Sequence, residues 1–397
     1  MKPRTALVIA LIATALGGMP IWLMGAYSPQ IVNTYGLDPS TFGAVLATFF
    51  GFSAMTGTAI GRYVNTIHWL VGVLLTSIFS VAGLLMLAFL GGGIPLILMG
   101  LFVAALANSF SQPSANKGLA LHITPTYQGR AFGLKQAALP ISTFVVSLSV
   151  PLFSTGEDWR YAYASIALIS ASLGVYSIIR LGAGRDYLKR SFAKAFNRST
   201  YRWKREKAVK EPIPRYLKYL AIGAGLGTGS TMSFAGFLVL FAVSRGFTPE
   251  QSALVLALGS FVGIFARIYF GFLADKRGRR HFIFVALMMV GGAVGFVVLA
   301  LTQNLAMLII GTILGFGMGW AWNGVFHFAV IKVKPESSAF FTGVVQASMA
   351  GGATVGPAVY GVLSQQFSFS IAWFFLAATL LLAAVFVLYG RKLLPAP

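Results

Sequence analysis

The sequence has no cysteine and very few acidic residues. The absence of cysteine excludes disulfide bonds, thiolate metal sites and cysteine nucleophiles. Asp and Glu together number nine, and all nine fall between long apolar runs or at the ends of those runs. The four histidines lack the spacing of metal ligands, and no group of nucleophile, base and metal ligands is recognisable. We therefore expect no metal, no cofactor and no enzymatic activity.

Charged residues are scarce overall, at 10% of the chain, whereas 57% of the residues are hydrophobic. With a mean hydropathy of +0.79, the chain could not cover its surface with polar groups as a soluble protein does. The composition therefore predicts a membrane protein whose main partner is the lipid bilayer.

The formal net charge of +21 would favour nucleic-acid binding in a soluble domain. Here the lysines and arginines instead gather in short segments between the apolar runs, a distribution typical of the cytoplasmic loops of membrane proteins. The charge therefore predicts membrane topology, and we expect no nucleic-acid partner.

Twelve apolar runs are long enough to cross a bilayer, which takes about 20 residues of helix. They predict an all-α membrane protein with transmembrane helices at residues 6–27, 40–62, 69–91, 94–121, 130–152, 159–181, 215–243, 249–272, 281–302, 305–331, 338–363 and 370–390. Because the number is even, both termini and almost all basic loops fall on one side. The charge bias makes that side cytoplasmic, as expected for a bacterial inner-membrane protein.

A basic segment separates two halves that repeat each other at an offset of 210 residues. The matching pairs include Gly17 with Gly227, Gly36 with Gly246, Pro39 with Pro249 and Gln136 with Gln346. Two parallel repeats of six helices place a cargo site between the halves, near the middle of the membrane. The predicted domains are a bundle at 1–181, a basic cytoplasmic linker at 182–214 and a second bundle at 215–397. A regulatory role of the linker stays open.

A loop motif follows the predicted helix 249–272 and reads Gly271-Phe272-Leu273-Ala274-Asp275-Lys276-Arg277-Gly278-Arg279-Arg280. It resembles the Gly-x-Leu-Ala-Asp-Arg/Lys-x-Gly-Arg/Lys-Arg/Lys motif of the major facilitator superfamily, and the twelve spans extend the resemblance over essentially the whole chain. The resemblance implies a transporter that works by alternating access, and we expect a monomer. The implied gating residues are Gly271, Asp275, Gly278 and Arg279.

The matching loop of the first half departs from this motif. Asn65 stands where an aspartate is expected, and His68 stands where the second glycine is expected. We therefore expect strong gating charge in the second half only.

Positive groups occur inside the predicted spans, although acids do not. They are Lys117, Lys135 and Arg267, together with the titratable His327. A lysine or arginine at the centre of a membrane helix costs about 2.5–3.5 kcal/mol on insertion scales. Several such cations without a partner acid favour an anionic cargo. Each also lies within about 6–10 Å of a helix end, so an orientation toward the membrane surface stays open.

Polar residues also line one face of the predicted helix 94–121, where they recur at every fourth position. A polar stripe on a membrane helix should face water or cargo rather than lipid. The 210 offset provides an equivalent face on helix 305–331, and two aromatic residues of helix 6–27 are candidate cavity residues. The predicted substrate-binding residues are Trp22, Tyr27, Asn108, Gln112, Asn116, Lys117, Lys135, Arg267, Trp320, Asn323 and His327.

Three further comparisons with the superfamily bear on the cargo. The segment 129–140 resembles a pattern of a bacterial branch in or near which several anion carriers lie. Arg267 stands where monocarboxylate and oxalate carriers have an anion-binding arginine, although a packing or gating role stays open. The fifth helix lacks the glycine-rich pattern of drug antiporters, which disfavours export of cationic drugs.

The sequence therefore predicts a secondary active transporter for a small organic anion, coupled to protons or working by exchange. A coupling proton would travel on His327 or on the cargo, because no acid lies within a span. The alternative is an efflux pump for neutral or amphipathic compounds, suggested by the many aromatic and methionine residues.

Overall fold

The chain folds into helices throughout the part that the structure describes. The structure is a computed structural model, and it describes residues 2–89, 93–182, 212–276, 281–334 and 338–394. In these ranges eleven helices are long and apolar enough to cross a membrane. One more, α15 (Ser338–Gln366), is also long enough at 29 residues but is richer in glycine, serine and glutamine. The predicted all-α membrane fold is confirmed.

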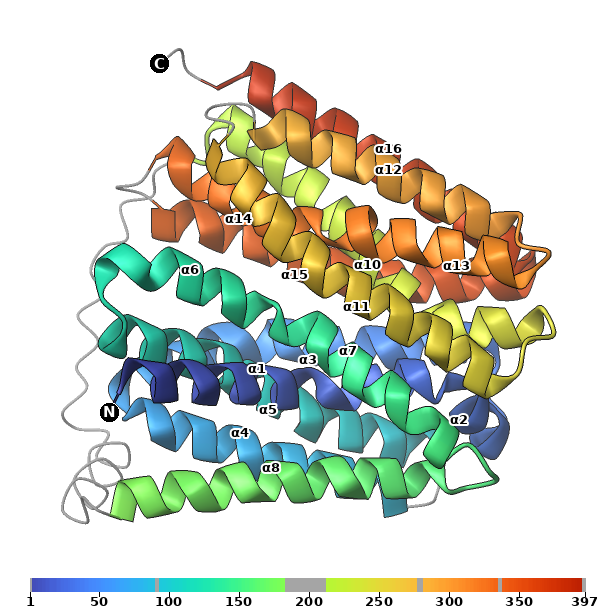
Figure 1. Ribbon diagram of the computed structural model, residues 1–397, viewed down its shortest axis with the longest axis horizontal. Coiled ribbons are helices and arrows are strands. Elements are labelled where there is room, and N and C mark those ends of the chain that lie inside the picture. The colour runs from blue at the N-terminus through green and yellow to red at the C-terminus, as the bar shows by residue number, and fades with distance from the viewer. Residues whose placement is uncertain (1, 90–92, 183–211, 277–280, 335–337, 395–397) are drawn as a thin grey trace.

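Two groups of helices, each with six spans, lie side by side (Figure 1). The first group contains α1 (Pro3–Ala26), α2 (Ser28–Tyr35), α3 (Pro39–Thr66), α4 (Trp69–Phe89), α5 (Ile94–His122), α6 (Pro125–Gln136), α7 (Ala138–Ser149), η1 (Val150–Leu152) and α8 (Trp159–Gly182). The second contains α10 (Arg215–Ser244), α11 (Pro249–Lys276), α12 (His281–Ala300), α13 (Leu305–Leu314), η2 (Gly315–Trp320), α14 (Trp322–Val333), α15 and α16 (Phe369–Lys392). We call these groups the first and the second bundle.

The first and last described residues lie at the same end of the molecule (Figure 1). We call this the terminal end and the opposite one the far end. Residues 183–211 of the predicted linker 182–214 lie outside the described residues. The predicted domain boundaries therefore stay a prediction.

The repeat of 210 residues corresponds to a repeated turn at the start of the second span in each bundle. Gly36 and Gly246 have φ angles of 60° and 89°, in the left-handed region that favours glycine. Each is followed by a proline that begins a helix, Pro39 in α3 and Pro249 in α11. In the first bundle the Asp38 carboxylate caps α3 by accepting a hydrogen bond from the Thr41 amide at 2.7 Å. This bond lowers the pKa of Asp38.

The two bundles touch closely at the far end, where α3 of the first packs against α15 of the second. A β-carbon added at Gly43 would lie 3.0 Å from the Cα atom of Gly361, so no side chain fits there. In the same region the Ser40 backbone amide donates a hydrogen bond to Oε1 of Gln365 at 3.1 Å. At the far end α3 and α15 are therefore in direct contact, beside a cavity of about 410 Å³ whose lining includes Gly36 of the first bundle and Leu240 of the second.

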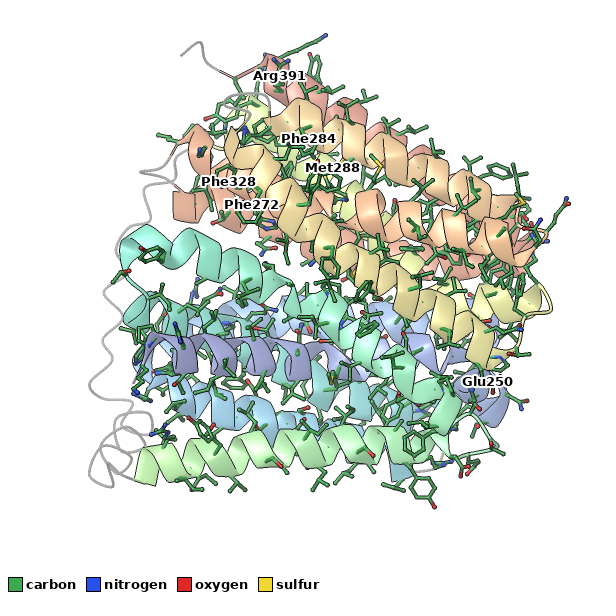
Figure 2. The ribbon with its side chains drawn as sticks, viewed as in Figure 1. Glu250, Phe272, Phe284, Met288, Phe328 and Arg391 are labelled. Atoms are coloured by element: carbon green, nitrogen blue, oxygen red, sulfur yellow. The ribbon has the colours of Figure 1, made fainter. Side chains whose placement is uncertain are left out.

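The same two helices diverge toward the terminal end. A β-carbon added at Gly57, Gly61 or Gly343 would meet no atom within 4 Å. Near the terminal end of α11, the side chain of Phe272 is 64% exposed (Figure 2). The contact between α3 and α15 is thus closer at the far end, at Gly43 and Gly361, than at these glycines near the terminal end.

Cysteines introduced in pairs test this arrangement, because the natural chain has no cysteine to compete. We expect the variant Ser40→Cys with Gln365→Cys to be linked nearly completely by a short thiol cross-linker, since these residues are in contact. The control variant, Gly61→Cys with Gly343→Cys, joins the same helices near the terminal end and should link several-fold less. The yield is measured by mass spectrometry of cross-linked peptides. Equal yields for both pairs would contradict the closer contact at the far end.

Candidate functional site

Lys135 is the most deeply buried charged side chain of the candidate site. It lies in the last turn of α6 and is only 2% exposed. Its ammonium donates hydrogen bonds to Oε1 of Gln112 at 2.6 Å and to Oδ1 of Asn116 at 2.7 Å. These residues are four apart on α5, which places them one above the other on the same face. Both acceptors are uncharged amides, so the lysine is solvated but not neutralised.

The fifth span breaks directly after this lysine, between α6 and α7. Pro140 has no backbone N–H, so it cannot donate the helical hydrogen bond to the carbonyl of Gln136, four residues earlier. That carbonyl instead accepts a hydrogen bond from Nη1 of Arg267 at 2.8 Å. Arg267 belongs to α11, so the break in a helix of the first bundle creates an acceptor for a cation of the second.

The Arg267 guanidinium also lies against the aromatic ring of Trp320. It lies 5.1 Å from the ring centroid of Trp320, within the range of a cation–π interaction. Its Nη2 atom is buried and has no hydrogen-bond partner in the described ranges. A buried, charged N–H group without an acceptor raises the free energy of the folded protein, unless a ligand or a water molecule accepts its hydrogen bond.

Trp22 of α1 and Trp320 of η2 face each other across the boundary between the bundles. Their ring centroids are 5.3 Å apart and the ring planes meet at 56°. Both indoles are at least 95% buried, and neither Nε1 has a hydrogen-bond partner in the part of the chain described. Trp320 ends a π-helical turn of six residues, a distortion that is often found at functional sites.

His327 of α14 completes the group. Its Nδ1 lies 2.9 Å from the backbone carbonyl of Asn323. A carbonyl can only accept, so Nδ1 carries the hydrogen. Nε2 is buried and has no hydrogen-bond partner among the described residues.

Arg267 binds the backbone carbonyl of Gln136, the residue after Lys135, and His327 lies near both cations. The structure therefore brings together cations from both bundles. We define the cation cluster as Lys135, Arg267 and His327, with Gln112, Asn116, Trp22 and Trp320 around it.

Lys117 lies outside this cluster, although the sequence analysis placed it in the cavity. Its ammonium donates hydrogen bonds to the backbone carbonyls of Val64, Asn65 and Ile67, at 3.0, 2.9 and 2.6 Å. These carbonyls are at the C-terminus of α3, where a positive charge also complements the helix dipole. Lys117 thus anchors one helix end to its neighbour, and we leave it out of the site.

Asn108 and Tyr27 also have partners elsewhere. Nδ2 of Asn108 donates to Oγ of Ser53 at 3.2 Å, which joins α5 to α3. The buried Tyr27 hydroxyl lies 2.8 Å from Oγ of Ser149, at the far end of α7. Ser149 is 14 residues beyond Lys135, or about 21 Å along a helix. The structure therefore does not bring these two residues to the cluster.

The predicted gating residues belong to the terminal end of α11 and the loop that follows. Gly271 and Asp275 fall within α11, and a β-carbon at Gly271 would meet no atom within 4 Å. Gly278 and Arg279 lie outside the described residues. The gating role of all four stays a prediction.

Three residues that shape the cluster were not among the predicted site residues. Gln136 offers its backbone carbonyl, Pro140 frees that carbonyl, and Phe316 packs against Trp320 with ring centroids 5.2 Å apart. A proline four residues after a glutamine was a usable signal for the first two, because it predicts a free carbonyl inside a span. The glycines between Gly315 and Trp320 were a weaker signal for the distorted turn.

Comparisons with known proteins agree with this architecture. The sequence profile of the Major Facilitator Superfamily matches residues 7–346. An uncharacterized transporter, YybO, of Bacillus subtilis (strain 168) is 26% identical over 155 residues, which are 38% of this chain and 34% of that protein's own length. The match therefore spans about a third of this relative.

Solved structures share the fold over nearly the whole chain. Two crystal structures of a bacterial homologue of the human lysosomal transporter Spinster are similar to it. The inward-facing occupied form is 15% identical with a TM-score of 0.71, and 99% of this chain and 96% of that one are covered. The inward-facing unoccupied form is 14% identical with a TM-score of 0.73, and 99% and 97% are covered. At this level of identity the likeness concerns the fold alone.

Replacement of Lys117 separates its anchoring role from ligand binding. We expect Lys117→Met to lower the free energy of unfolding by about 1–2 kcal/mol, because three carbonyls at the end of α3 lose a charged donor. Lys117→Arg, which keeps the charge and the donors, should recover part of this loss. The measurement is the Tm of the detergent-solubilised protein. An unchanged Tm in Lys117→Met would contradict the anchoring role.

Proposed function

The chain belongs to the Major Facilitator Superfamily and is a multi-pass membrane transporter, and we propose that it carries a small organic anion. The cargo binds between the two bundles and moves by alternating access, coupled to protons or in exchange. In this proposal the protein lies in a bacterial inner membrane with both termini in the cytoplasm, and it works as a monomer.

The observation that carries the proposal is the meeting of buried cations with no counter-charge. Lys135 and Arg267 come from different bundles, and both have neutral oxygen acceptors only. Among the side chains that the structure describes, an ion pair closer than 4.0 Å joins Arg160 and Glu157, on α8 and just before it, and includes neither of these cations. Unpaired buried charges are unfavourable, and an anion that enters between them supplies the missing charge.

The donors of the cluster suit a carboxylate. Arg267 has Nη2 free to donate beside the Nη1 that binds Gln136, and Lys135 adds a compact ammonium. Carboxylate oxygens accept charge-assisted hydrogen bonds of both kinds. The unpaired indole N–H groups of Trp22 and Trp320 offer two further donors, while their ring faces can pack against the apolar part of an organic anion.

The path to the cluster runs from the terminal end. Asn116 is exposed, although the Lys135 that it binds is buried. Gly133, two residues before Lys135, also faces open space. With cytoplasmic termini, the structure corresponds to an inward-facing carrier. An inside-negative potential opposes the entry of each negative charge by about 2.3 kcal/mol per 100 mV, so uptake requires a coupled cation or an exchanged anion.

A second candidate is efflux of neutral or amphipathic compounds, and one observation favours it. Trp22, Trp320 and Phe316 form a continuous aromatic contact beside the cluster, with ring centroids 5.3 and 5.2 Å apart. Such a surface could hold a hydrophobic compound without using the cations. Drug susceptibility of cells with and without the protein would then differ, whereas carboxylates would not bind.

A thermal-shift screen followed by uptake into proteoliposomes tests the anion proposal. The screen uses lactate, succinate, benzoate and phenylacetate, each beside its neutral amide. We expect at least one carboxylate, but not its amide, to raise the Tm of the purified protein. Lys135→Met and Arg267→Met should each reduce the affinity for that carboxylate about 30-fold or more, because a buried charge pair loses one partner.

The matched control for these variants is Lys117→Met, which removes a lysine from a span without touching the cluster. Its carboxylate affinity should stay within about threefold of the parent value, the usual spread of such measurements. If amides raise the Tm as much as the acids, and if Lys135→Met binds them like the parent protein, the cargo is neutral and the anion proposal is wrong.

A further inference from the structure

We propose that Lys135 is the group that carries the coupling proton of this transporter. In this mechanism the lysine gains a proton when the anion binds and loses it when the anion leaves. The inference rests on the proposed anion transport. It adds the identity of the coupling ion and its binding site, in a chain whose nine acids lie between the apolar runs or near their ends.

The first reason is the environment of the ammonium. Lys135 is 2% exposed, so water solvates it poorly. Its two bonded neighbours, Gln112 and Asn116, contribute dipoles but no charge. A buried ammonium in this position is stable beside an anion and unfavourable without one. A neutral amine can still donate hydrogen bonds to both amide oxygens, so loss of the proton leaves these contacts available.

The second reason is the set of charged groups that face Lys135 from the packed helices. Its helix, α6, packs against α1, α5, α7 and α11. Arg267 of α11 binds the backbone carbonyl of Gln136, the residue after Lys135. His327 of α14 lies near enough for electrostatic interaction with Lys135. On α5 the cation Lys117 is turned to the end of α3.

The remaining packed helices add no charge near Lys135. The basic residue of α1, Arg4, is exposed in the first turn of that helix. The sequence of α7 contains no titratable residue. In the empty site Lys135 therefore faces a permanent positive charge and, in the described ranges, no negative one.

The other two members of the cluster, Arg267 and His327, are less suited to this role. An arginine guanidinium stays protonated throughout the pH range in which proteins are folded. His327 holds its one hydrogen on Nδ1 against the Asn323 carbonyl. A second proton on Nε2 would add a third positive charge beside Lys135 and Arg267, which both lie near this ring. Lys135 can instead alternate between a charge of +1 and a neutral amine. The cluster then never holds more positive charge than that of Lys135 and Arg267 together.

The chemical step is a simple protonation. The lone pair of the neutral amine takes one proton from water on the entry side, and the resulting ammonium donates a hydrogen bond to the anion. On the exit side the anion leaves and the ammonium returns the proton to water. Binding of the proton and binding of the anion strengthen each other by the same factor, because linkage is reciprocal. One proton accompanies one anion, so transport of a monoanion moves no net charge.

The test uses the carboxylate that gives the largest thermal shift in the screen of lactate, succinate, benzoate and phenylacetate. In proteoliposomes with a pH one unit lower outside than inside, the parent protein should accumulate this acid about tenfold, the ratio expected for one proton per anion. Lys135→Arg keeps a permanent cation. It should bind and exchange the acid more slowly than the parent protein but show no accumulation in response to the gradient. Lys117→Arg is the matched control and should respond like the parent.

A second measurement keeps the inference testable if Lys135→Arg folds poorly. The parent protein is mixed with the same carboxylate in weakly buffered detergent solution containing a pH indicator. Near the pH at which its affinity begins to fall on alkalinisation, we expect uptake of up to one proton per bound anion. Affinity should fall further as the pH rises, because the neutral amine attracts the anion less.

The possible outcomes separate the two proposals. If no carboxylate binds or exchanges, the proposed function fails. If carboxylates bind and exchange but the parent protein takes up no proton between pH 6 and 9, the function stands and the role of Lys135 is refuted. If Lys135→Arg accumulates the acid in the gradient as the parent does, the proton travels on another group, and the role of Lys135 is again refuted.

Discussion

The structure depends on how positive charge is held inside a membrane protein without negative charge to balance it. Each cation of the cluster is bound by neutral oxygens: Lys135 by two side-chain amides, Arg267 by a backbone carbonyl. These dipoles make the charges tolerable but leave the net charge uncompensated. The helix break at Pro140 contributes to this arrangement, because it leaves the Gln136 carbonyl free to accept the hydrogen bond from Arg267. Both cations therefore have bonded oxygen acceptors but, in the described ranges, no negative partner.

The two bundles are related by sequence, but equivalent positions in them make different contacts. Lys117 and His327 occupy equivalent positions at the offset of 210 residues. In the first bundle this position anchors the end of α3 through three carbonyls, whereas in the second it faces the cation cluster. The end of α3 has Asn65 in place of the motif aspartate, and the backbone carbonyl of this residue is one of the three that Lys117 binds. The repeat thus preserves the arrangement of the helices, whereas the side chains at equivalent positions differ in type and in contacts.

Much of the fold could be predicted from the sequence, because the thickness of a bilayer fixes the length of each span. The predicted helix 94–121 is observed as Ile94–His122, and 249–272 as Pro249–Lys276. Less of the site could be predicted. The spacing of Gln112 and Asn116 predicted a shared polar face, but it did not reveal that Lys135 from another helix would bind both. It also suggested a common face for Lys117, which turns to the end of α3 instead.

The sequence by itself determined the twelve spans, their repeat, and an interior with cations but no acids, since each follows from composition and from spacing along one helix. Only the tertiary structure decided which cations meet. The side chain of a lysine can reach several neighbouring helices, and its partner depends on which free carbonyl or amide lies within hydrogen-bond distance. Lys117 binds backbone carbonyls at the end of α3, and Lys135 binds side-chain amides of α5, because the packing of the helices placed these oxygens within hydrogen-bond distance.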